Sequence, residues 1–211
     1  MEEDSILDSK DVSLEDAISS LNIPLSELNP DALGIVHRLD RGTSGCIILA
    51  KNDMTHAKLV TAFFSRNAKK SYLAIVSYHV QEACLQKRQI HEKDLAVGFR
   101  GSIDIKVQGK PALSEYTVLK IIPEHVILLR VVTYTGRYHQ VRQHCAQGLG
   151  RPILFDPEYG FTSEPLLKLM EGNTHGHSRF CLHCETLSID SLQIHADAPV
   201  PSWWNTLLKK P

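Results

Sequence analysis

Short apolar runs separated by polar turns dominate the chain from about residue 33 onward. Runs rich in Val, Ile and Leu with turn residues at both ends predict β-strands, either half-buried or buried. We expect strands over residues 33–37, 45–50, 71–78, 102–108, 112–122 and 125–134, and a final hairpin over 182–194. The tight loop DRGTSG separates the first two runs.

Helical spacing of apolar positions is confined to a few segments. We expect helices over residues 13–22, 53–66 and 138–148, and a last helix that begins near residue 202. Ser13, Asp53 and Ser202 are the expected N-caps, and Asp16 completes a capping box with Ser13. Many strands with a few helices, in no regular alternation, predict an α+β fold with a mixed, largely antiparallel sheet.

The charge along the chain is unevenly distributed, although the 211 residues carry a net charge of only −1. Residues 1–31 hold nine acidic residues and one basic residue, whereas residues 32–211 hold 22 basic and 15 acidic residues. We therefore predict an acidic leader over 1–31, flexible or loosely docked, and a basic domain over 32–211. A basic domain fits a polyanionic partner, and the alternative is a set of ordinary solvated charges.

The composition limits the compartment and the class of protein. A hydrophobic content of 43% is enough for a sizeable core. No apolar run approaches the roughly 18 to 20 residues of a membrane span, and the acidic start resembles no secretory signal. We expect an intracellular protein, in the cytoplasm, with the nucleus or an organelle as alternatives. The five cysteines are then expected to be free thiols.

One cysteine- and histidine-rich segment suggests a zinc site. His175, His177, Cys181 and Cys184 are ligands of a suitable type. Their spacing is compressed, and on a strand Cys181 and Cys184 point to opposite faces, so we interpret the cysteines as small core residues and predict no metal. A zinc-dependent binding module remains an alternative.

The segment His37–Gly45 has the highest density of reactive groups. Asp40 lies between Arg38 and Arg41, whose charges favour an ionised carboxylate that can act as a nucleophile or a base. The alternative is a surface salt-bridge cluster on a hairpin. Ser44 with His37 could suggest a hydrolase, but no G-x-S-x-G elbow surrounds Ser44.

This segment, HRLDRGTSGCIILAKN, resembles the signature of the RluA-type family of RNA pseudouridine synthases. Residues 135–144, TGRYHQVRQH, are similar to the family's T-G-R-x-H-Q-I-R-x-H motif. Shorter similarities follow in the family's order at residues 70–74, 109–112, 150–160, 179–185 and 201–204. The resemblance covers roughly residues 33–208 and rests on two long motifs.

The resemblance implies a pseudouridine synthase fold, in which helices flank the central sheet around a catalytic cleft, and conversion of uridine in rRNA or tRNA to pseudouridine. It implies no cofactor and no metal. Asp40 matches the catalytic aspartate, Tyr72 the tyrosine that packs under the base and is thought to assist proton removal, and Arg142 the arginine that ion-pairs with the aspartate. Without the motif, Tyr72 would be interpreted as a core aromatic and Arg142 as part of a solvated helix face.

The same resemblance implies RNA as the partner. We also expect a monomer with no obligate protein partner. The candidate RNA-binding residues are Arg38, Arg41, Arg66, Lys69, Lys70, Arg137 and His139. Arg38 could instead fill the space that the base vacates, and His139 and His144 could be structural.

The chain departs from the family at its front. We find no N-K-P-x-G strand in residues 1–30, which predicts a domain without the family's first strand or a leader that replaces it. An inactive RNA-binding paralogue of the same fold is the alternative function.

Overall fold

The structure is a computed structural model that describes residues 13–81, 95–160 and 180–209. The chain forms two compact units, which we describe separately. The smaller unit contains the chain up to Arg38 and returns for Ile47–Ser65. The larger unit contains Leu39–Cys46 and the chain from Arg66 to its end. The prediction of a flexible or loosely docked leader over 1–31 remains a prediction.

The described part of the smaller unit, from residue 13 onward, contains two helices and a short 3-10 helix: α1 (Leu14–Ser20), η1 (Pro30–Ala32) and α2 (Asp53–Phe64). The capping box between Ser13 and Asp16 is confirmed. The N-cap of α2 is Asn52 and not Asp53, because the Asp53 carboxylate accepts hydrogen bonds from Ser26 Oγ and the Glu27 N–H, both at 2.8 Å.

The strands expected over 33–37 and 45–50 were wrong. Their backbones pair in one isolated bridge between Ile35 and Leu49, and the Ile48 N–H donates to Nε2 of His37 at 2.9 Å. Leu33 and Gly34 have φ of 47° and 72°, a left-handed conformation that bends the chain out of an extended path. Within the second run, Gly45 alone belongs to a strand, the two-residue β1 (Ser44–Gly45).

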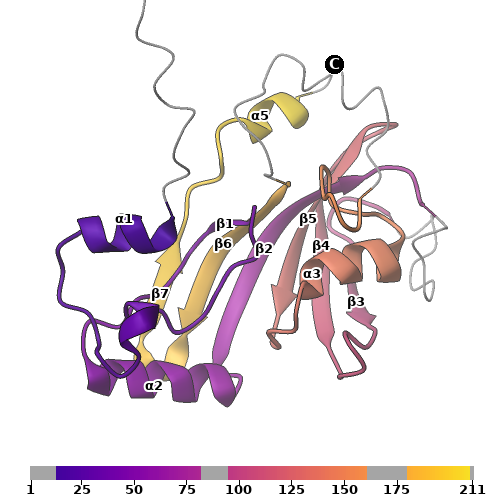
Figure 1. The fold of residues 1–211 in the computed structure, drawn as a ribbon. Helices are drawn as coiled ribbons and strands as arrows, with labels where there is room; N and C mark the ends of the chain where they lie inside the picture. The colour runs from indigo at the N-terminus through magenta and orange to yellow at the C-terminus, as the bar shows by residue number, and fades with distance from the viewer. Residues whose placement is uncertain (1–12, 82–94, 161–179, 210–211) are drawn as a thin grey trace, which may run out of the picture. The chain divides into compact units, whose positions relative to one another are not determined.

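The larger unit is built on one seven-stranded sheet (Figure 1). Its other strands are β2 (Ala68–Ser77), β3 (Arg100–Asp104), β4 (Leu113–Ile122), β5 (Val126–Thr133), β6 (Leu182–Ile189) and β7 (Ile194–Asp197). The order is β1-β6-β2-β5-β4-β3, with β7 paired to β6. Among the described strands only the β1–β6 pair is parallel, which confirms an α+β fold with a mixed, largely antiparallel sheet.

Short helices complete this unit: α3 (Gln140–Gln143), the π-helical turn η4 (His144–Gly148), the 3-10 helix η5 (Asp190–Leu192) and α5 (Trp204–Leu207). The helix expected over 138–148 is thus only partly α-helical. The expected cap at Ser202 was wrong, because α5 has Trp203 at its N-cap position and no side-chain cap bond. None of the described helices is long and apolar enough to cross a membrane.

Candidate active site

Asp40 lies on a tight turn that leads into β1, which pairs with β6 of the central sheet. The Thr43 N–H donates to the Asp40 carbonyl at 2.9 Å, and the turn runs directly into β1. Ser44 Oγ lies 2.8 Å from Nδ1 of His183 on β6. Gly45 has φ of 120°, and a side chain there would collide with the backbone of Cys184. The sheet edge therefore fixes the residues just beyond Asp40.

The charge of Asp40 acts on two side chains of β2. Burial lowers the pKa of Lys70, and electrostatic interactions with the Cys184 thiol and the Asp40 carboxylate partly oppose that effect. The pKa of Tyr72 is raised well above its ordinary value of 10, first by burial and then by Cys184 and Asp40. Lys70 Nζ also lies next to Gly136 of the TGR motif. The predicted catalytic residues Asp40 and Tyr72 are thus close enough for the charge of Asp40 to affect the pKa of Tyr72.

Arg142, on α3, is buried in a cluster of acidic and aromatic side chains. Its Nε and Nη2 donate to both oxygens of Asp156, at 2.7 and 2.8 Å, and Nη2 also lies 3.3 Å from Glu158. Its guanidinium carbon lies 5.0 Å from the ring centre of Tyr159 and 4.6 Å from that of Phe180. Burial lowers the pKa of Arg142, but its acidic neighbours raise it more, so the group remains charged.

This arrangement differs from the ion pair that the resemblance implies. Among the residues that the structure describes, the ion pairs of Arg142 are with Asp156 and Glu158 and not with Asp40. Both Asp156 oxygens occupy the guanidinium fork, and Asp156 Oδ1 also accepts the N–H groups of Glu158 and Tyr159. Asp40 influences Arg142 only through its electrostatic field.

Gln140 connects the loop over residues 135–137, the start of the TGRYHQVRQH segment, to strand β4. Its Oε1 accepts from Thr135 Oγ1 at 2.6 Å and from the Arg137 N–H at 3.2 Å. Its Nε2 donates to the Leu113 carbonyl at 3.0 Å and to Ser114 Oγ at 3.1 Å. Gln140, Asp156, Glu158 and Phe180 were not among the site residues expected from the sequence, although all lie within the segments that resemble the family.

The predicted RNA-binding residues fall into different environments. Arg41, Arg66 and Lys69 are exposed, and Lys70 and Arg137 are half-buried. Arg38 is also exposed but belongs to the smaller unit.

His139 is almost fully buried. Only 8% of it is exposed, and its Nδ1 lies 3.2 Å from both the Tyr159 hydroxyl and Glu158. His144 is fully buried, and its Nε2 lies 3.2 Å from the Ile105 carbonyl. The geometry favours the structural interpretation of both histidines.

The cysteines of the zinc hypothesis are buried free thiols. Burial raises the pKa of Cys184 to about 12 and that of Cys181 well above its ordinary value, so both thiols are protonated at neutral pH. The described residues contain no cluster of three or more suitable metal ligands. His175 and His177 lie outside the described residues.

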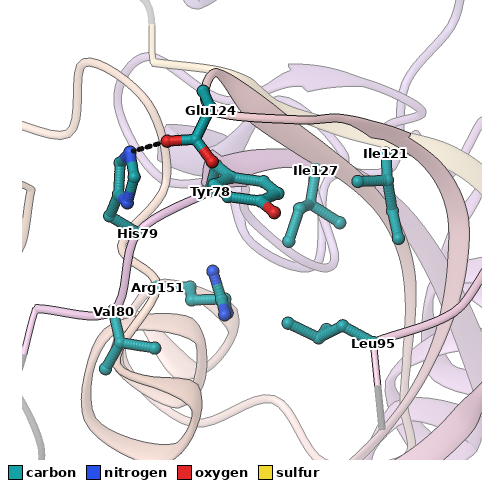
Figure 2. A pocket seen from close by; sticks show the side chains of 8 residues that line it. All are labelled: Tyr78, His79, Val80, Leu95, Ile121, Glu124, Ile127 and Arg151. Carbon is teal, nitrogen blue, oxygen red and sulfur yellow. Dashed lines mark ion pairs between the residues drawn. The ribbon is translucent and has the colours of Figure 1, made fainter. Parts of the chain in front are cut away.

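A cavity of about 340 Å³ lies at the opposite end of β2 from Lys70. Figure 2 shows its lining side chains: Tyr78, His79, Val80, Leu95, Ile121, Glu124, Ile127 and Arg151. His79 and Glu124 form an exposed ion pair at 3.4 Å. The seven residue steps from Lys70 to Ser77 span about 23 Å in a strand, and no predicted site residue lines this cavity.

Comparison with known proteins identifies the family. A family model described as RNA pseudouridylate synthase matches residues 7–147. An uncharacterised RNA pseudouridine synthase of Zymomonas mobilis is 36% identical over 179 residues, which cover 82% of this chain and 75% of the relative. A second, from Aquifex aeolicus, is 39% identical over 141 residues, which cover 64% of this chain and 42% of the relative.

A relative with a more specific name, ribosomal large subunit pseudouridine synthase D of Zymomonas mobilis, is 30% identical. The match covers 83% of this chain and 55% of that protein, so the chain spans about half the length of this relative and of the Aquifex relative.

Two human structures have a similar fold. Human RNA pseudouridylate synthase domain containing 4 has a TM-score of 0.63 at 23% identity, over 82% of this chain and 74% of that one. Human RNA pseudouridylate synthase domain containing 1 has a TM-score of 0.56 at 26% identity, and the match covers 79% of this chain and 69% of that one. The RluA-type resemblance of the sequence is confirmed, and this chain belongs to the RNA pseudouridylate synthase family.

Proposed function

We propose that this chain is an RNA pseudouridine synthase that isomerises uridine in rRNA or tRNA, with Asp40 as its essential residue. The observation that carries this proposal is the electrostatic environment of Asp40. Burial has the largest effect on the pKa of Lys70, which it lowers, and on that of Tyr72, which it raises, and Asp156 does most to raise that of Arg142. The charge of Asp40 adds a smaller upward contribution to all three groups, which come from β2 and α3. A carboxylate in such a setting, on a turn fixed by β6, suits chemistry at a glycosidic carbon.

The proposed reaction requires a group that can stabilise or capture a cationic sugar carbon. The bond between N1 and C1′ breaks, which develops positive charge at C1′ that the Asp40 carboxylate can stabilise or bind covalently. The base then turns, and C5 bonds to C1′. The proton on C5 leaves and N1 gains a proton, so the product is an isomer of the substrate.

Tyr72 is suited to hold the base in its flipped position. Its raised pKa keeps it as a neutral phenol at neutral pH. A target base must leave its stack to react, and an aromatic ring offers it a replacement surface. The neutral state favours this role over that of a proton acceptor in the free enzyme.

Arg142 has a supporting role in this proposal. Its charge is balanced by Asp156 and Glu158, so it contributes less net positive field at Asp40 than an unpaired arginine would. We propose that Lys70, which lies near both Asp40 and Gly136, supplies the nearer cation.

RNA binding is proposed to use the exposed cations. The exposed side chains that are available for phosphate contacts are Arg38, Arg41, Arg66 and Lys69. Arg137 donates a hydrogen bond from Nε to the Pro111 carbonyl at 3.2 Å, so its other guanidinium nitrogens would have to make any contact with RNA. The name of the similar synthase D refers to the large ribosomal subunit, which favours rRNA over tRNA as the substrate.

The test is release of tritium from RNA labelled at C5 of uridine, because only a reaction that removes the C5 hydrogen releases it. The wild-type chain is compared with Asp40→Asn and with Asp190→Asn, a matched control at an exposed position on η5. We expect release by wild type and by Asp190→Asn, and background release by Asp40→Asn with RNA binding retained. Release by Asp40→Asn at the wild-type rate would contradict the assignment.

The same assay addresses the alternative, an inactive RNA-binding paralogue of the same fold. Wild-type protein that binds separated rRNA and tRNA but releases no tritium from either would favour that alternative. Release from one of the two RNA classes identifies the substrate class.

A further inference from the structure

A second cavity, of about 540 Å³, begins two residues beyond Asp40. One wall is the turn Gly42–Ser44, the other is Pro201–Trp203, and Phe180 also lines it. Its volume falls in the range of small-ligand pockets. All of these residues are uncharged, so the cavity suits a neutral, planar group better than a phosphate or a carboxylate.

The cavity adjoins the candidate active site on two sides. Gly42 is two residues from Asp40, so their Cα atoms are at most about 7.6 Å apart. The ring of Phe180 lies 4.6 Å from the guanidinium carbon of Arg142. A strand of RNA whose target nucleotide reaches Asp40 would therefore bring a neighbouring nucleotide to this cavity.

The aromatic wall is held in place by buried contacts. Trp204 is 1% exposed and contacts the rings of Trp203 and His183 edge-on, with ring centres 6.0 and 6.1 Å apart. His183 is in turn fixed by Ser44 Oγ at 2.8 Å and by the Ala198 carbonyl at 3.1 Å. Trp203 itself is only half-buried, which leaves indole surface available to the cavity.

We propose that this cavity is a base-binding subsite in which a nucleotide that flanks the target uridine stacks on Trp203. The inference rests on the proposed function, which supplies the RNA, and it adds a residue that determines sequence context. A base stacked on an aromatic side chain contributes to affinity largely through its flat face. A base is favoured over a protein segment because the cavity is continuous with the turn that carries Asp40.

The test measures binding, in the full chain with Asp40→Asn, so that no turnover is needed. The probe is a short single-stranded RNA with one uridine between adenosines, compared with versions that are abasic at one flanking position. The chain has two tryptophans and Trp204 is buried, so quenching of indole fluorescence by a bound base reports Trp203. Loss of the quench in the Trp203→Phe variant confirms its source.

Trp203→Ala is expected to weaken binding of the base-bearing RNA roughly 5- to 150-fold, while Trp203→Phe stays within a few-fold of the parent. The RNA that lacks the stacked base should bind the parent and Trp203→Ala equally. The matched control is Tyr78→Ala, which removes an aromatic side chain from the distant cavity of Figure 2 and should leave affinity unchanged.

Three results would overturn the subsite. These are unchanged affinity in Trp203→Ala, an equal loss for base-bearing and abasic RNA, and no quenching by any of the RNAs. Because these readouts do not depend on tritium release, they remain valid if the proposed isomerisation fails. Base-dependent quenching without tritium release would support the subsite and reject the synthase.

Discussion

Replacement of Asp156 by Asn should destabilise the protein far more than neutralisation of its exposed neighbour Glu158. Asp156 binds both donors of the Arg142 fork, and the side chains of Asp156 and Arg142 are 0% and 5% exposed. Asn retains an oxygen that can accept the backbone N–H groups of residues 158 and 159. The substitution therefore removes chiefly the charge that compensates a buried guanidinium.

The magnitude follows from what remains around Arg142. Loss of one partner of a buried ion pair costs about 3–5 kcal/mol, because the other charge is left without compensation. Glu158 still lies 3.3 Å from Nη2, and the rings of Tyr159 and Phe180 still contact the guanidinium, so the lower end applies. We expect Asp156→Asn to lower the free energy of unfolding by about 3 kcal/mol.

Urea unfolding at pH 7, followed by circular dichroism, measures this free energy. Glu158→Gln is the matched control: the Glu158 side chain is 48% exposed, and an exposed ion pair contributes about 0–1 kcal/mol. If the two substitutions cost the same, the buried pair does not carry the stability assigned to it, and the account of Arg142 is wrong.

Two further predictions concern buried histidines. Burial lowers the pKa of His144 to about 4 from 6.5, so the unfolded chain binds the extra proton first as the pH falls. Between pH 7.5 and 4.5, wild type should lose about 2–3 kcal/mol more unfolding free energy than His144→Gln, and parallel losses would contradict this. Ser44→Ala, which leaves Nδ1 of buried His183 without its partner, should cost about 1–3 kcal/mol in chemical denaturation. The exposed control Ser202→Ala should stay within about 0.5 kcal/mol, and an equal cost in both would count against the role of the Ser44 hydroxyl.

The sheet was largely predictable from the pattern of apolar residues. The ranges expected for β4 and β5 agree with the structure to within one residue at each end, because residues in β4 alternate in burial and those in β5 are mostly buried. The run over 33–37 has a similar composition but contains Leu33 and Gly34 in left-handed conformations. Composition alone does not reveal such a bend.

The candidate site was predictable only in part. The motifs identified Asp40, Tyr72 and Arg142, and the structure brings the last two within the electrostatic influence of the first. The motifs did not identify the main partner of Arg142. That partner is Asp156, which lies 14 residues further along the chain than Arg142. Tertiary packing selects that partner, and a single sequence carries little information about it.

The division of the chain into two units has a consequence for truncation. The chain leaves the smaller unit after Arg38, contributes Leu39–Cys46 to the larger unit and then returns for Ile47–Ser65. Asp40 is therefore tethered on both sides to the smaller unit, although it belongs to the larger one. No single cut can separate the two units and keep Asp40 covalently attached to the sheet. A fragment that keeps Asp40 on the sheet without the smaller unit would have to begin near residue 39 and carry a designed connection from residue 46 to residue 66.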